Sequence, residues 1–103
     1  MAGENILVID DNPTLLKIVS RTLGRAGYRV RTAEGGARGV SAAKSERPDV
    51  ILLDYLMPGL DGEAVCRALG QDPTLRDVPV IVMSAKGDKI NTRFVEQLGA
   101  VDY

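Results

Sequence analysis

The sequence predicts an α/β fold built on a doubly wound parallel sheet, and three observations support that prediction. Three short apolar runs, at residues 6–9, 50–53 and 80–83, are rich in Val, Ile, Leu and Met, a composition typical of strands buried on both faces of a parallel sheet. Segments with helical spacing separate these runs, and the connections are short. Such alternation implies parallel strands, right-handed crossovers and helices on both faces of the sheet.

The first helix has clear signals at both ends. After the first apolar run, Asn12 is a favoured cap residue and Pro13 suits a first helical turn, whereas Gly27 is a common helix terminator. Between them, seven residues recur at helical spacing: Leu15, Leu16, Ile18, Val19, Thr22, Leu23 and Ala26.

The second strand and second helix follow directly. Tyr28, Val30 and Thr32 alternate with Arg29 and Arg31, which indicates a half-exposed strand. We place this strand at the sheet edge, where its arginines would deter pairing with another chain. A second helix is expected over residues 37–46, with Pro48 stopping it before the next buried strand.

The second half of the chain repeats the pattern. Residues 58–62 form a loop, and Ala64, Val65, Ala68 and Leu69 mark a third helix. Residues 72–79 connect it to the third buried run. A fourth helix is expected around Ile90, Phe94 and Leu98, closed by Gly99, and residues 100–103 begin a fifth strand. The half-exposed second strand favours the strand order 2-1-3-4-(5), with all 103 residues in one domain.

Composition narrows the possible functions. Thirteen basic and 14 acidic residues leave a net charge of −1, so no electrostatic footprint predicts binding to nucleic acid or to a membrane surface. One cysteine, Cys66, fits a reducing cytoplasm and reads as a small buried hydrophobe. The absence of histidine excludes Ser–His–Asp and Cys–His catalysis by this chain alone, and any phosphohistidine must belong to a partner.

Each buried run ends on an oxygen-bearing side chain. Asp10 and Asp11 follow the first run, Asp54 follows the second, and Ser84 follows the third. Ligands of such sheets bind outside the carboxyl ends of the strands, where the strand order reverses, so the three acids should meet there. Mg²⁺ prefers oxygen ligands and would relieve their repulsion. Asp54 is then placed as a nucleophile toward phosphorus, with the Ser84 hydroxyl and the Ala85 N–H as donors to the phosphoryl oxygens.

Four stretches carry a resemblance to a known family. These are Ile6-Leu7-Val8-Ile9-Asp10-Asp11-Asn12, Leu53-Asp54-Tyr55-Leu56-Met57-Pro58-Gly59-Leu60-Asp61-Gly62, Val82-Met83-Ser84-Ala85 and Leu98-Gly99-Ala100-Val101-Asp102-Tyr103. Together, and in this order, they resemble the receiver domain of two-component response regulators. The resemblance covers nearly the whole chain, and it implies a flavodoxin-like fold.

The resemblance implies a phosphorelay function. Asp54 would accept a phosphoryl group from a histidine kinase or phosphotransfer protein, and a downstream effector domain or protein would read the change. Asp11, Asp54 and the Leu56 carbonyl would bind Mg²⁺, assisted by Asp10. Ser84 matches the family's switch hydroxyl and Tyr103 its switch aromatic. The domain would catalyse at most its own phosphorylation and dephosphorylation, without being an enzyme otherwise.

The chain departs from the family after Tyr103. Receivers carry a lysine shortly after the switch aromatic, then a proline and a final helix, and Lys86 and Lys89 do not match that lysine. We therefore expect weaker phosphorylation, or weaker coupling to the switch. A fourth strand left at an exposed edge would invite pairing. Truncation, proteolysis, and completion by homodimerisation or strand swapping stay open as explanations.

Other functions fit the residues less well. A pseudo-receiver that serves as an interaction scaffold keeps the fold without the chemistry, and the three acids argue against it. A haloacid-dehalogenase-like phosphatase needs an Asp-x-Asp pattern after the first strand, which residues 10–12 do not give. The glycine-rich residues 34–39 do not match the dinucleotide motif, and carboxylates after the first strand oppose a flavin phosphate. The basic stretch Arg21, Arg25, Arg29 and Arg31 reads as a solvated face.

Overall fold

The computed structural model describes residues 3–54, 62–83 and 100–102. In chain order, the elements are β1 (Asn5–Asp10), α1 (Pro13–Arg25), β2 (Arg29–Glu34), α2 (Gly36–Ser45), β3 (Val50–Asp54), α3 (Gly62–Gln71), β4 (Val80–Met83) and β5 (Ala100–Asp102). The predicted fourth helix lies outside the described residues.

The described strands form one parallel sheet in the order β2-β1-β3-β4-β5, which confirms the predicted order. The edge position of β2 is confirmed as well. The fourth strand differs from the expectation that it would lie at the edge, because the three-residue β5 pairs with it. The backbone from Ala100 onward is thus sufficient to add a strand.

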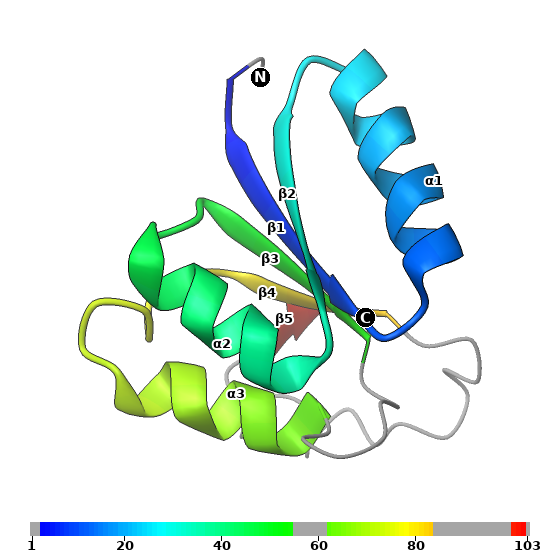
Figure 1. Cartoon of the computed structure of the whole chain (residues 1–103). Helices are drawn as coiled ribbons and strands as arrows, with labels where there is room; N and C mark the ends of the chain where they lie inside the picture. Colours follow the sequence, from blue (N-terminus) through cyan, green and yellow to red (C-terminus); the bar gives the residue numbers. More distant parts are fainter. Residues whose placement is uncertain (1–2, 55–61, 84–99, 103) are drawn as a thin grey trace.

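Helices lie on both faces of the sheet, as Figure 1 shows: α1 covers one face, and α2 and α3 cover the other. The core follows this division. Ile6 and Val8 pack with Leu16 of α1, whereas Leu7 and Ile9 belong to the larger cluster with α2, α3, β3 and β4. All six residues of β1 are buried, which explains why its central residues, 6–9, form a continuous apolar run.

The helix ends agree with their sequence signals. The Asn12 side chain accepts hydrogen bonds from the N–H groups of Thr14 and Leu15, at 3.0 and 3.2 Å, and Pro13 occupies the first turn of α1. Gly27 follows the helix at φ 100°, a backbone conformation that glycine adopts readily. Among the described residues, no helix has the length and apolar character that crossing a bilayer requires.

A close approach between α2 and β1 was not evident from the sequence. Gly39 is buried, and a Cβ added there would lie 2.5 to 2.8 Å from three side-chain atoms of Ile9. The missing side chain lets α2 lie against the strand directly before Asp10. Gly39 therefore allows the close packing of α2 on the carboxyl end of β1, beside Asp10.

A polar network secures the opposite end of the sheet. Asn5 is buried, and its amide donates to the Glu46 carboxylate at 2.7 Å while its oxygen accepts from the Arg31 Nε at 3.3 Å. Arg31 also donates to the carbonyl of Ala42 at 3.0 Å and to that of Glu46 at 2.6 Å, at the end of α2. The prediction that Arg31 belongs to a solvated face was wrong, because its guanidinium binds the Asn5 side chain and two carbonyls at the end of α2.

Candidate functional site

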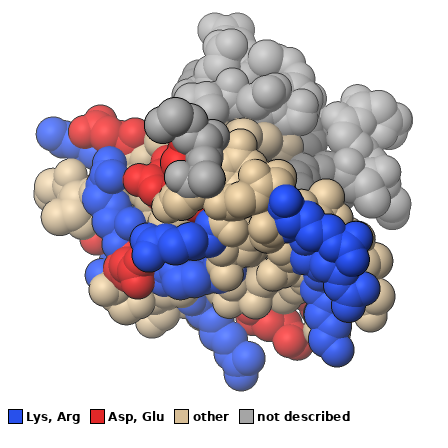
Figure 2. All heavy atoms as spheres, turned by 90° about the horizontal axis from the view of Figure 1, so that it is seen from above, with Lys and Arg blue, Asp and Glu red and all other residues tan. Residues whose placement is uncertain are grey.

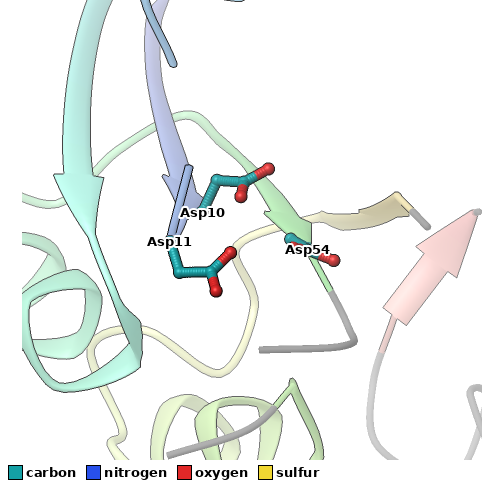
Figure 3. Close-up of side chains that lie close together, drawn as sticks. All are labelled: Asp10, Asp11 and Asp54. Carbon is teal, nitrogen blue, oxygen red and sulfur yellow. The ribbon is translucent and has the colours of Figure 1, made fainter. Parts of the chain in front are cut away.

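Three carboxylates meet at the carboxyl ends of β1 and β3. Asp10 ends β1, Asp11 follows it, and Asp54 ends β3. One oxygen from each lies within 4.8 Å of the others, which confirms the predicted convergence. In Figure 3 the carboxyl groups of Asp10 and Asp11 point toward the side on which Asp54 lies.

The local backbone makes this convergence possible. β1 and β3 are neighbours in register, with Ile9 opposite Leu53, so both strands end at the same level. Consecutive residues of a strand point to opposite faces, but Asp11 lies in a bend after β1. This bend allows two adjacent carboxylates to reach one site.

The three acids differ in their surroundings. Asp10 is only 2% exposed, Asp54 is half-buried and Asp11 is exposed. Burial raises the pKa of Asp10 from the usual 3.8 to about 6. The Asn12 N–H, 3.0 Å from Asp10 Oδ1, opposes this rise, while the charge of Asp54 and hydrogen bonds with Asp11 and Asp54 add to it. A buried acid held between two others is electrostatically unfavourable in its charged form.

This arrangement fits a small divalent cation. The donors are carboxylate oxygens, which Mg²⁺ and Ca²⁺ prefer, and three of them would leave coordination positions for the waters or phosphate oxygens that Mg²⁺ commonly keeps. A cation there would favour the ionised form of Asp10 and offset the cost of crowding three acids. Asp10, Asp11 and Asp54 are thus the described residues able to hold a metal.

The remaining predicted site residues lie outside the described residues. These are Leu56, Ser84, Ala85 and Tyr103. The sequence reasoning missed the backbone N–H of Asn12, which binds the Asp10 carboxylate. This contact is an Asx-turn, in which an Asp side chain accepts a hydrogen bond from the backbone N–H two residues later. The Asp-x-x pattern in a predicted turn was the sequence signal for it.

Comparison with known proteins decides the family. The response regulator receiver domain family matches residues 6–103. The chain belongs to this family. Receiver domains are signalling domains rather than conventional enzymes, and they work with histidine kinases and effector domains.

Individual relatives agree with this assignment. The receiver domain is 38% identical over 98 residues to protein PilH of Pseudomonas aeruginosa, covering 95% of this chain and 81% of PilH. It is 36% identical over 101 residues to the alkaline phosphatase synthesis transcriptional regulatory protein PhoP of Bacillus subtilis, covering 98% of this chain but only 41% of PhoP. PhoP is a transcriptional regulatory protein, and this chain covers less than half of it. The expectation that this chain does not bind nucleic acid therefore stays a prediction.

A solved structure supports the fold, and it contains a metal ion. The receiver domain of a sensor histidine kinase from P. aeruginosa is 33% identical, with a TM-score of 0.88, covering 99% of this chain and 84% of that one. That structure has a magnesium ion coordinated in its active-site cleft.

Proposed function

We propose that this receiver domain accepts a phosphoryl group on Asp54 from the phosphohistidine of a histidine kinase or phosphotransfer protein, and that Mg²⁺ is required. The observation that supports this proposal is the meeting of Asp10, Asp11 and Asp54 within 4.8 Å at the end of a receiver fold. The chain contains no histidine, so the donor imidazole belongs to a partner. A cytoplasmic location is part of the same proposal.

The three acids have different tasks in this proposal. An oxygen of Asp54 forms a bond to phosphorus while the phosphorus–nitrogen bond of the donor breaks and its electron pair returns to the imidazole. Asp54 suits this task because it is partly exposed, so an incoming phosphoryl group can reach it, whereas Asp10 is almost completely buried. Asp10 and Asp11, with Asp54 and the Leu56 carbonyl, would hold Mg²⁺, which supplies positive charge against the phosphoryl oxygens.

The switch residues complete the proposal. The Ser84 hydroxyl and Ala85 N–H would donate to the phosphoryl oxygens, and Tyr103 would respond to the movement of Ser84. The changed surface would then control an effector domain or protein. No observation favours a pseudo-receiver, since a scaffold has no need for three converging carboxylates that repel one another.

The experiment is phosphorylation by acetyl phosphate, followed by intact mass spectrometry. We expect the mass of one phosphoryl group to be added with Mg²⁺ and not with EDTA. Asp54→Asn should abolish the addition. Asp77→Asn should preserve it, because Asp77 is an exposed acid outside the cluster. If wild type and Asp54→Asn respond identically, or if neither responds to Mg²⁺, the proposal is wrong.

A further inference from the structure

A hollow lies along the open edge of the sheet, apart from the acidic cluster. Its volume is about 660 Å³, and its walls come from α1 and α2 while its floor is formed by residues 32–34 of β2. This volume lies within the usual range of binding pockets. β2 is the terminal strand of the sheet on this side, so the hollow follows an edge that a further strand can join.

The backbone of β2 has hydrogen-bonding groups directed toward this edge. The Arg29 N–H donates to the Glu4 carbonyl and the Gly35 N–H to the Asp10 carbonyl, both at 2.9 Å. The odd-numbered residues of β2 therefore direct their backbone N–H and C=O groups toward β1. Successive residues of a strand direct their backbone polar groups to opposite sides. Thr32 and Glu34 therefore present their N–H and C=O groups to the hollow.

Three of the four charged side chains that line the hollow are basic. Lys17 and Arg21, one turn apart on α1, line one wall, and Arg38 of α2 lines the other. All three are exposed, and Glu34 is the single acid among the described lining residues. Figure 2 looks down on the face where β1 and β2 begin and shows groups of Lys and Arg side chains, including on the side where α1 lies. The edge thus combines a strand backbone with positive charge.

We propose that the β2 edge binds an extended acidic peptide segment of a partner protein, which joins the sheet as a strand beside β2. Backbone hydrogen bonds would supply affinity, as in other cases of strand addition. Because side chains alternate between the two faces of a strand, carboxylates of the peptide would reach Lys17 and Arg21 on one side and Arg38 on the other. This inference does not depend on phosphorylation of Asp54.

Two other occupants fit the observations less well. A second copy of the chain would bring its own Lys17, Arg21 and Arg38 to the same edge, and like charges would repel. DNA would have no backbone ladder to pair with residues 30–34, whereas an added strand uses the outward N–H and C=O groups of Thr32 and Glu34. A peptide uses both the strand edge and the charge.

The experiment is an NMR titration of the ¹⁵N-labelled chain. The probe is an acetylated, amidated hexapeptide, Glu-Glu-Val-Glu-Glu-Val, whose adjacent Glu pairs place carboxylates on both faces of the strand, and its matched control has Lys in place of Glu. We expect the acidic peptide to shift the amide signals of residues 30–34 and of 17–21 most strongly, with weakening as salt rises. The basic peptide should produce no such shifts.

Variants distinguish the charge from the backbone contribution. Lys17→Glu with Arg21→Glu should weaken binding about tenfold or more, whereas Arg76→Glu, an exposed cation outside the hollow, should stay within about twofold. Thr32→Pro removes one outward N–H at an edge where proline is tolerated, and it should weaken binding while a thermal melt stays cooperative.

Several results would overturn the proposal. They are the absence of shifts at millimolar acidic peptide, shifts centred away from β2, or equal effects of the basic peptide. A short DNA duplex that shifts β2 where the acidic peptide does not would also reject it. So would concentration-dependent self-association that broadens the signals of residues 30–34 in the absence of peptide.

Discussion

Gly39→Ala should destabilise the protein, although alanine is normally the better helix former. The added Cβ would lie 2.5 Å from Cδ1, 2.7 Å from Cγ2 and 2.8 Å from Cγ1 of Ile9. Ile9 is fully buried, so its side chain can move only by displacing other core side chains. Overpacking of this kind costs about 1–3 kcal/mol, against a gain of about 0.5–1 kcal/mol from replacing a helical glycine. We expect a net loss of about 1–2 kcal/mol in the free energy of unfolding.

The matched control is Gly24→Ala, because Gly24 also lies in a helix and a Cβ there meets nothing within 4 Å. Urea unfolding of both variants should show Gly24→Ala as stable as wild type or more so. Ile9→Val removes the nearest atom, so the double variant with Gly39→Ala should be more stable than the two single effects predict, by about 0.5 kcal/mol or more. Equal stability of Gly39→Ala and Gly24→Ala would refute the close packing of α2 on β1.

Three further predictions follow from single groups. In metal-free protein the raised pKa of Asp10 favours its protonated form in the folded state, so stability should fall as pH rises from about 4 to above 6, by about 1–3 kcal/mol. Urea unfolding at several pH values measures this fall in stability. Asp10→Asn should make the stability nearly independent of pH in this range, and Mg²⁺ should reduce the fall in wild type. A wild-type stability that does not change with pH would contradict the pKa shift. Asn12→Ala should cost about 1 kcal/mol by removing the α1 cap, while Asn12→Asp should retain most of the stability; circular dichroism during urea unfolding measures both, and an unchanged Asn12→Ala would exclude the cap. Burial raises the pKa of the Cys66 thiol to about 11, so it should react with a thiol reagent at pH 8 only after unfolding, and rapid reaction of the native protein would show that the core opens there.

Periodicity predicted most of the fold because it reports which faces are buried. The continuous apolar run of β1 and the alternation in β2 each indicated how many faces a neighbour covers, and the strand order followed. The boundaries were less accurate. The second strand starts at Arg29 and extends to Glu34, because its pairing with β1 continues to Asp10 rather than stopping where the alternation fades.

The sequence pattern did not predict which partners a polar side chain finds or how deeply it is buried. Arg31 was indistinguishable from its neighbour Arg29 in the sequence, and only the placement of the end of α2 gives it carbonyl partners. Likewise, the sequence placed Asp10 and Asp11 at the site without showing that one is buried and the other exposed. That difference depends on the bend after β1 and on the packing around it. The burial of Cys66 was predicted correctly, since an apolar helical face is visible in the sequence.

Asn12 links the acidic cluster to a helix. Its N–H binds the Asp10 carboxylate, and its side chain holds the first two free N–H groups of α1. A change in the charge or position of Asp10 therefore acts on the same residue that fixes where α1 begins. Because α1 also carries Lys17 and Arg21, Asn12 connects the acidic cluster to the helix that forms one wall of the basic hollow beside β2.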